Sequence, residues 1–210
     1  MVFVQSIGGY VSLFELQSFS AGGLAPWDIT LGAAECITLT GPSGSGKSRL
    51  LRAMADLDLH EGAALLEGRP CHSYTPCQWR RHVGLLPAES AWWSTSVGDH
   101  FTTEPEAGSL AALGFKPEVM GWELSRCSTG ERQRLALLRL LANRPRVLLL
   151  DEPTASLDSL NVASAEAMIR DYLLLQGAAA IWVSHDPAQA QRVAARHYAI
   201  EGTHVLEVGA

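Results

Sequence analysis

GPSGSGKS, residues Gly41 to Ser48, is the stretch that decides the fold of this 210-residue chain. It matches in full the pattern of a phosphate-binding loop, in which two glycines enclose four residues and lysine and serine follow. The glycines let successive backbone N–H groups point inward around phosphate groups, and the next helix adds its positive N-terminal end. The pattern predicts a nucleoside triphosphate site, in which Lys47 contacts the β- and γ-phosphates and Ser48 binds Mg²⁺. The residues expected to contact the nucleotide here are Gly41, Pro42, Ser43, Gly44, Ser45, Gly46, Lys47, Ser48 and Arg49.

Two carboxylates follow a buried strand further along the chain. Val147 to Leu150 is a continuous apolar run, which is typical of a strand covered on both faces, and Asp151 and Glu152 come directly after it. Ligands bind at the carboxyl ends of the strands in sheets of this kind. We therefore expect Asp151 to hold Mg²⁺ through water, and Glu152 to polarise the attacking water as a general base.

Strand and helix patterns alternate around these motifs. Strands are predicted at 11–19, 35–40, 63–66, 83–86, 147–150, 179–183 and 205–208, and helices at 48–57, 128–143, 161–176 and 187–195. In the first helix Leu50, Leu51, Met54 and Leu57 fall on one face. This alternation predicts an α/β fold with a mainly parallel sheet at its core. Together with the phosphate loop it indicates the P-loop NTPase class.

The stretch from Pro87 to about Trp122 changes character, because aromatic residues, glycines and prolines replace any strand pattern. We interpret it as a small, mostly helical insertion subdomain, covering approximately residues 88–130 of a single domain that spans residues 1–210. Ser128 with Glu131 three residues later has the form of a capping box, which starts the helix that follows.

Composition excludes several classes of function. The net charge is −6 and the longest run of basic residues is Arg80-Arg81, so we expect no nucleic-acid partner. The four cysteines form no C-x-x-C pair, which favours reduced thiols over a zinc site. The N-terminal residues lack the basic start of a signal peptide, and no apolar run is long enough to cross a bilayer. If the protein serves a membrane process, another chain supplies the membrane part.

Three further stretches complete a pattern that is specific in its order and spacing. They are CSTGERQR at residues 127–134, VLLLDEPTASLD at 147–158, and WVSHD at 182–186, which contains His185. From about residue 13 to residue 208 the chain resembles the nucleotide-binding subunit of an ATP-binding cassette (ABC) transporter, of the short bacterial type. CSTGE resembles the LSGGQ signature of that family, and LLLDEPTASLD resembles its Walker B strand and D-loop. His185 matches the switch histidine.

The resemblance implies an activity and partners. Two such subunits, expected to form a homodimer in the ATP state, clamp two ATP molecules head to tail. Ser128 and Gly130 of one subunit then face the γ-phosphate bound to Lys47 of the other, His185 contacts the γ-phosphate, and Asp158 of the D-loop lies among the nucleotide contacts. ATP and Mg²⁺ are the implied cofactors, and hydrolysis drives a separate transmembrane permease from the cytoplasmic face of the inner membrane.

The chain departs from the family pattern in two places. In the signature, Cys127, Thr129 and Glu131 replace Leu, Gly and Gln, but the start of the helix stays polar and we expect function to survive. After the strand at 83–86 the family has Pro-Gln, and here the residues are Pro87-Ala88-Glu89. Either Glu89 substitutes from one position along, as a contact near Mg²⁺, or that contact is missing.

Aromatic residues raise two more questions. Phe19 and Trp27 are the nearest candidates to stack on adenine, but neither has the expected spacing, and core or rim packing is favoured for Trp27. Trp92 and Trp93 are adjacent, so at least one ring is expected to be partly exposed. An exposed ring could dock a short helix of the permease, whereas the alternative is that both rings pack inside the insertion.

Two other functions stay open at this stage. A soluble ABC-type ATPase acting on DNA or ribosomes would normally carry a coiled coil, a second cassette or basic surfaces. A regulatory module that binds nucleotide without hydrolysis is suggested by the missing Gln, but the retained Lys47, Asp151, Glu152 and His185 argue against it. The sequence indicates neither the cargo nor the direction of transport.

Overall fold

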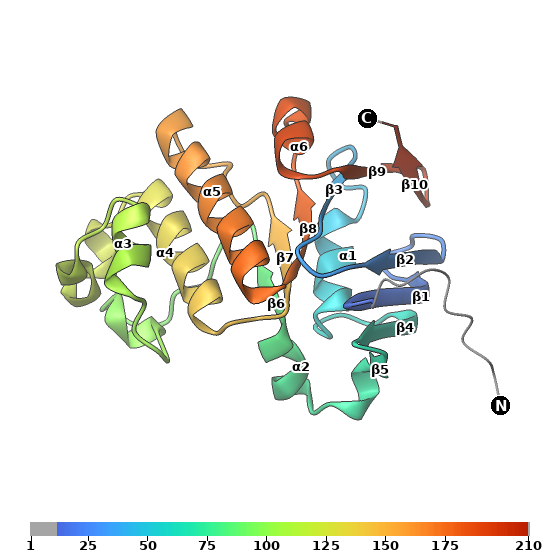
Figure 1. The fold of residues 1–210 in the computed structure, drawn as a ribbon, viewed down its shortest axis with the longest axis horizontal. Coiled ribbons are helices and arrows are strands. Elements are labelled where there is room, and N and C mark those ends of the chain that lie inside the picture. The colour runs from blue at the N-terminus through green and yellow to red at the C-terminus, as the bar shows by residue number, and fades with distance from the viewer. Residues whose placement is uncertain (1–11, 210) are drawn as a thin grey trace.

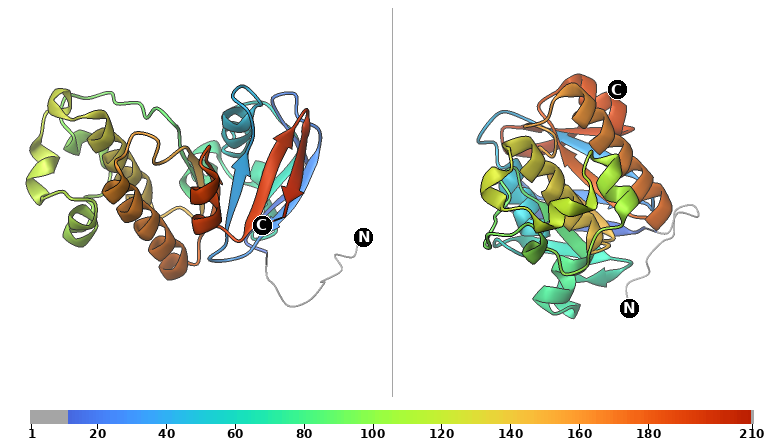
Figure 2. Two further views of the ribbon diagram at one scale, coloured as in Figure 1. Left: turned by 90° about the horizontal axis from the view of Figure 1, so that it is seen from above. Right: turned by 90° about the vertical axis from the view of Figure 1, so that its left-hand side faces the viewer.

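The computed structural model describes residues 12–209 of the chain. Val11, which begins the first predicted strand, and the N-terminal residues considered as a signal peptide lie outside the described residues. Figure 1 shows the element order. Figure 2 shows the helices of residues 107–176 toward one end of the molecule and most strands toward the other, where the helix of residues 47–54 also lies.

The larger sheet has the strand order β10-β9-β3-β8-β7-β6. Its members are β3 (Cys36–Thr40), β6 (Val83–Leu86), β7 (Val147–Asp151), β8 (Ala179–Val183), β9 (Arg196–Glu201) and β10 (His204–Val208). All neighbours pair in parallel except β10, which runs antiparallel to β9. The predicted α/β fold with a mainly parallel sheet is therefore confirmed.

A second, antiparallel sheet lies beside the first and was not predicted as a sheet. Its order is β2-β1-β4-β5, formed by β1 (Phe14–Ser20), β2 (Trp27–Leu31), β4 (Glu61–Leu66) and β5 (Arg69–Pro70). The register between β1 and β4 shifts after Gln17, where Ser18 has a φ of 45°. A Cβ on Gly62 would lie 2.2 Å from the Ser18 carbonyl oxygen, so this bulge requires glycine.

Helices cover both faces of the parallel sheet. They are α1 (Lys47–Met54), α2 (Pro76–His82), α3 (Ala107–Ala112), α4 (Thr129–Ala142), α5 (Ser159–Gln176) and α6 (Pro187–Val193), with 3₁₀ turns at Cys71–Ser73, Gly98–His100, Pro117–Gly121 and Leu124–Arg126. Alternate residues of β7 enter different cores. Leu149 packs in the cluster that contains α1 and the antiparallel sheet, whereas Leu148 and Leu150 pack in the cluster that contains α4 and α5.

Several predicted boundaries agree with the structure and others do not. The predicted strands at 83–86 and 179–183 match β6 and β8 in full. The first helix, in contrast, ends at Met54, and Asp56 then takes a left-handed φ of 56°. The predicted inward position of Leu57 is therefore wrong, and its side chain is exposed. The sequence reasoning also missed β2, β5, β9 and α2.

The insertion is less helical than predicted. Between Pro87 and Ser128 it contains one short α-helix, α3, and three 3₁₀ turns, and the rest is extended or irregular, with a bridge between Ser96 and Glu123. Glycines and prolines punctuate residues 98–121, but residues 88–97 contain neither and are not helical either, so "mostly helical" was wrong. The capping box is confirmed, since Ser128 caps α4 and both of its reciprocal hydrogen bonds with Glu131 are present.

Within residues 12–209, no helix combines the length and the apolar character that crossing a membrane would need.

Candidate nucleotide site

The Gly-rich stretch forms the loop that joins β3 to α1. Gly44 and Gly46 have φ values of 79° and 100°, which side-chain-bearing residues rarely adopt. Gly46 is the N-cap of α1 and offers no side chain to the first turn, so the N–H groups of that turn are left for another acceptor. Ser45 Oγ is also buried without a hydrogen-bond partner among the described residues. The loop is thus a preformed cradle for an anion.

Lys47 folds back over this loop. Its side chain is buried, and Nζ donates to the carbonyl oxygens of Gly41 at 2.8 Å and Pro42 at 2.9 Å. Desolvation lowers the pKa of Lys47, and the nearby charges of Glu152 and Asp151 oppose that effect. Phosphate oxygens are stronger acceptors for an ammonium group than carbonyls are, so an incoming phosphate can replace both.

The two predicted carboxylates lie at the carboxyl end of β7, as expected. Asp151 is the last residue of the strand and is buried, whereas Glu152 leaves the strand with a left-handed φ of 50°. The neighbouring strand β8 ends at Val183 and is followed by His185. His185 Nε2 lies 2.9 Å from Glu152 Oε1, so the strand order brings these two predicted catalytic residues together.

A buried glutamine, Gln189, connects the loop that follows β7 to the loop that follows β8. Gln189 donates to Thr154 Oγ1 at 2.8 Å and to Glu166 at 2.9 Å, and its own oxygen accepts from Ser184 Oγ at 2.9 Å. It therefore ties the loop after β7 to the loop after β8. The sequence reasoning missed Gln189, because nothing in a single glutamine on a short helix indicates such a role.

The signature residues and the D-loop contact each other within one chain. Ser128 Oγ accepts from the Glu131 N–H at 3.2 Å and donates to the Glu131 carboxylate at 2.8 Å. A Cβ on Gly130 would lie 2.9 Å from the Ser156 carbonyl oxygen, so the start of α4 lies directly against the D-loop. Asp158 caps α5 through Asn161, and these hydrogen bonds lower the pKa of its carboxyl group.

The structure does not place all predicted contacts at the loop. Ser128 and Gly130 contact their own helix start and Ser156. Their predicted contact with the γ-phosphate bound to Lys47 of a second subunit is not tested by a single chain and stays a prediction. Arg49 is exposed and its side chain lies beside Gly22 of the β1–β2 turn. Glu89 is exposed in the segment after β6.

Ser48 and Asp151 offer the oxygen ligands that Mg²⁺ prefers. The described residues contain no group of three or more His, Cys, Asp or Glu side chains able to hold a metal. The two oxygen donors of Ser48 and Asp151 fit Mg²⁺, because this ion is usually bound through one or two protein oxygens together with phosphates and water.

Neither candidate ring is free to stack on adenine. Phe19 is fully buried and stacks on His60, with ring centroids 4.7 Å apart. Trp27 is buried and packs edge-on against Tyr198 at 5.3 Å, in line with the core packing favoured for it.

The two adjacent tryptophans of the insertion have different exposure. Trp92 is half-buried and Trp93 is 70% exposed, which confirms that at least one ring is open to solvent. Both rings pack edge-on against His100, at 4.8 Å and 4.6 Å, and the Arg139 guanidinium lies over both.

His100 also determines the backbone of this segment. Its Nε2 accepts the N–H groups of Trp93 at 2.9 Å and Ser94 at 3.0 Å. Its Nδ1 lies 2.9 Å from the Ser96 carbonyl oxygen, and since a carbonyl only accepts, Nδ1 carries the proton. The sequence reasoning missed His100.

A comparison with known families identifies the chain. The sequence profile of the family described as "ABC transporter" matches residues 24–155. The chain belongs to the ABC transporter family. The resemblance drawn from the motifs is therefore confirmed, and the phosphate loop and the Walker B strand both lie within the matched ABC residues.

Several proteins of known name are similar to the chain. It is 36% identical over 179 residues to Protein STAR1 of Oryza sativa subsp. japonica, covering 80% of this chain and 52% of that protein. It is 34% identical over 182 residues to the aliphatic sulfonates import ATP-binding protein SsuB of Cupriavidus pinatubonensis, covering 85% and 60%. It is 32% identical over 171 residues to the probable iron export ATP-binding protein FetA of Escherichia coli, covering 76% of each. The chain thus spans between half and two thirds of the length of the first two relatives.

Solved structures share the ABC fold. A bacterial Atm1-family ABC exporter with ATP bound superposes with a TM-score of 0.80 at 20% identity, covering 95% of this chain and 39% of that chain. A dimeric ATP-binding cassette in a post-hydrolysis state, bound to ADP and Pi, gives 0.79 at 19% identity, covering 94% and 98%. These likenesses confirm the P-loop NTPase fold.

Proposed function

We propose that this chain, as a single ATPase domain, binds and hydrolyses Mg-ATP as the ATP-binding subunit of an ABC transporter. One observation carries the proposal. The carboxylate of Glu152 lies 2.9 Å from His185 Nε2 at the carboxyl ends of two adjacent parallel strands, in the same site as Lys47 and its phosphate loop. A carboxylate, an imidazole and a buried ammonium group at that edge are the groups that phosphoryl transfer to water requires.

The residues would act in the following way. The Lys47 ammonium exchanges its two loop carbonyls for β- and γ-phosphate oxygens and neutralises their charge. Glu152 accepts a proton from the attacking water, and His185 donates a hydrogen bond to a γ-phosphate oxygen. Because Glu152 and His185 now bond each other, nucleotide binding has to separate them before either group can act.

Mg²⁺ would be held by Ser48 Oγ and, through water, by Asp151. Bound there, the ion would neutralise charge on the β- and γ-phosphates. Glu89 is proposed as a further contact on the exposed segment after β6.

The active unit is proposed to be a head-to-tail homodimer around two ATP molecules. Ser128, Gly130 and Asp158 of one subunit would complete the site of the other. The start of α4 suits that role, because its N–H groups favour an anion and Gly130 leaves them unshielded by a side chain. The dimer of the similar ATP-binding cassette is consistent with this arrangement.

The partner is proposed to be a separate permease, with this chain on the cytoplasmic face of the membrane. One similar protein is named for import and another for export, so we propose neither a cargo nor a direction of transport. The segment with Trp92 and Trp93 is the proposed docking point, since Trp93 is an exposed aromatic ring held in place by His100 and Arg139.

Glu152→Gln tests the catalytic proposal. The amide preserves the shape of the side chain but cannot accept a proton, so hydrolysis should fall by at least about a hundredfold while ATP binding persists. The trapped nucleotide should hold two subunits together, which size-exclusion chromatography with and without Mg-ATP would detect. The control is Glu118→Gln, which alters an exposed glutamate of the insertion and should leave turnover unchanged. Wild-type turnover in Glu152→Gln, or a monomer in saturating ATP, would contradict the proposal.

Docking is tested by co-purification of the full chain with the permease produced from the same cell. Trp93→Ala should lose the permease while keeping its own stability, whereas Leu59→Ala, which alters a side chain 97% exposed elsewhere, should keep both. Retention of the permease by Trp93→Ala would refute this docking point without touching the catalytic proposal. A separate test concerns Glu89. If Glu89→Ala keeps the permease-stimulated ATPase activity of the wild type, Glu89 is not a contact near Mg²⁺.

A further inference from the structure

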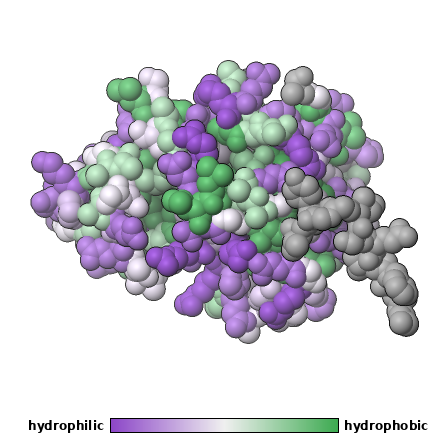
Figure 3. Space-filling model, viewed as in Figure 1, coloured by the Kyte–Doolittle hydropathy of each residue, from purple (hydrophilic) through white to green (hydrophobic). Residues whose placement is uncertain are grey.

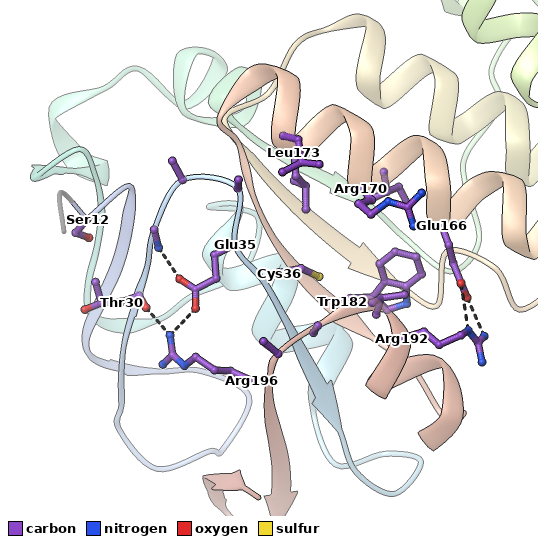
Figure 4. Close-up of a pocket in the computed structure, with 18 residues that line it drawn as sticks. Ser12, Thr30, Glu35, Cys36, Glu166, Arg170, Leu173, Trp182, Arg192 and Arg196 are labelled. Carbon is purple, nitrogen blue, oxygen red and sulfur yellow. Dashed lines mark hydrogen bonds and ion pairs between the residues drawn. The ribbon is translucent and has the colours of Figure 1, made fainter. Parts of the chain in front are cut away.

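A cavity of about 940 Å³ lies between α5, α6 and the amino-terminal part of β3, away from the phosphate loop that follows the other end of β3. Figure 4 shows the lining side chains, which include Cys36, Glu166, Ile169, Leu173, Trp182 and Val193. Its size falls in the range of small-molecule sites, and nothing in the proposed ATPase mechanism uses it.

One wall of the mouth of this cavity is apolar, and the exposed side chains of Arg170 and Arg192 also line the cavity. Hydrophobic residues gather near the middle of the face in Figure 3, over the C-terminal part of α5. There Leu174, which lines the cavity, is 64% exposed and the adjacent Leu175 is 81% exposed. Ile169 and Leu173 continue the same apolar wall inward. A ligand with an aliphatic body would remove this surface from water.

The floor of the cavity carries an unpaired donor. Trp182 is 1% exposed, and its Nε1 is buried with no hydrogen-bond partner in the described part of the chain. The indole N–H of Trp79, which is equally buried, shows the usual outcome, because it donates to the Met54 carbonyl at 2.9 Å. An unpaired buried N–H is costly and rare, so Trp182 indicates an acceptor that the chain itself does not supply.

The acidic groups in the lining already have partners. Glu166 accepts from Arg192 at 3.0 Å and from Gln189 at 2.9 Å. Glu35 accepts from Arg196 at 2.7 Å and from the backbone N–H of Gly32 at 2.7 Å. Neither carboxylate is therefore free to bind a cationic ligand.

One basic group in the lining remains open. Among residues 12–209, Arg170 forms an ion pair only with the adjacent Asp171. The distance from Arg170 Nε to Asp171 Oδ1 is 3.7 Å, and both side chains are largely exposed. In the view of Figure 4 the Trp182 indole lies between Arg170 and Arg192. Burial raises the pKa of the Cys36 thiol to about 12, so this group stays neutral and does not repel an anion. An indole N–H and a guanidinium, both donors, are thus available to a ligand, together with the Ser12 hydroxyl, whose Oγ is also buried without a partner among the described residues.

We propose that this cavity binds a small amphiphilic carboxylate. The carboxylate group accepts hydrogen bonds from Trp182 Nε1 and from the Arg170 guanidinium, and the aliphatic body lies against Ile169, Leu173 and Leu174. Charge assistance from Arg170 selects the anion over a neutral molecule of the same shape.

The experiment is a titration of the ¹⁵N-labelled full chain with hexanoate, read out at the indole N–H resonance that Trp182→Phe removes. Hexanoate should move this resonance saturably, and 1-hexanol at equal concentration should not. Arg170→Ala should weaken hexanoate binding about tenfold. Arg81→Ala, which removes an exposed arginine on α2, should leave it unchanged. Repeating the titration with Mg-ATP present should give the same affinity, so the result does not depend on the ATPase proposal.

Three results would overturn the inference. An equal response to 1-hexanol would show an apolar cavity without anion recognition. No movement of the resonance would show that water alone pairs with Trp182. Unchanged affinity in Arg170→Ala would remove the guanidinium from the site. This variant alters an exposed side chain, and its affinity can be read at any resonance that hexanoate shifts, so the result stands even if Trp182→Phe fails to fold.

Discussion

Replacing His100 by leucine should release the segment that carries Trp92 and Trp93. The imidazole is 4% exposed, and its Nε2 accepts two backbone N–H groups at 2.9 Å and 3.0 Å. Leucine fills a similar volume but accepts nothing, so the N–H groups of Trp93 and Ser94 lose their partner. Each unsatisfied group of this kind costs about 1–3 kcal/mol. Because the segment can open partly to water, we take the lower end for both and expect the free energy of unfolding to fall by about 2 kcal/mol.

Urea unfolding followed by circular dichroism measures this change. His100→Gln serves as the matched variant, because its amide oxygen can accept the same two N–H groups and should restore about half of the loss or more. Trp93→Ala removes a ring that is 70% exposed and should cost less than about 1 kcal/mol. If His100→Leu unfolds within about 0.5 kcal/mol of the wild type, the hydrogen bonds at Nε2 do not stabilise this segment and the reasoning fails.

Two further predictions concern charged residues. Lys47→Ala should weaken Mg-ATP binding by about tenfold or more, since the phosphates lose a charge-assisted donor, and isothermal titration would show it; unchanged affinity would refute the phosphate-loop assignment. Hydrogen bonds from the Ser128 backbone and side chain lower the pKa of Glu131, so its contribution to stability is present above the pKa of the unfolded state, about 4.3, and is lost as the pH falls through the lower folded pKa. Glu131→Gln should therefore reduce the loss of stability on acidification in this range, as measured by urea midpoints, and an unchanged pH profile would contradict the assigned cause.

The parts of the fold that the sequence predicted are those in which burial dictates the residue types. All five residues of β7 and of β8 are buried, and apart from Asp151 at the end of β7 they are apolar, so each strand was recognisable as a continuous apolar run. The antiparallel sheet has one face in the core, and the bulge at Ser18 disturbs the alternation of β1. The strand β2, in contrast, alternates strictly between buried and exposed residues, so its pattern was present in the sequence and was overlooked. Inside the insertion, glycine and proline punctuate only the part after Val97. In residues 88–97 the backbone N–H groups of Trp93 and Ser94 donate to the His100 side chain, and composition does not reveal such contacts.

The site shows the same division. Phosphate loop, carboxylates and histidine were predicted to lie at strand ends, because each motif is local in the chain. The contact between Glu152 and His185 could not be derived from spacing, since it depends on β8 lying next to β7 in the sheet. Gln189 and His100 were missed because each acts through partners distant in sequence or through backbone groups, and a lone polar residue does not reveal such partners.

The left-handed backbone of Glu152 would place the catalytic role proposed for this residue and the stability of the fold in opposition at one position. A residue with a side chain costs roughly 1 kcal/mol or more in this conformation, and glycine avoids that cost. Selection for thermal stability alone is therefore expected to favour variants with glycine or asparagine at position 152. These variants should be more stable and should have lost ATP turnover. If Glu152 is the general base proposed above, residue 152 would be the first place to look when a thermostable derivative of this protein turns out to be inactive.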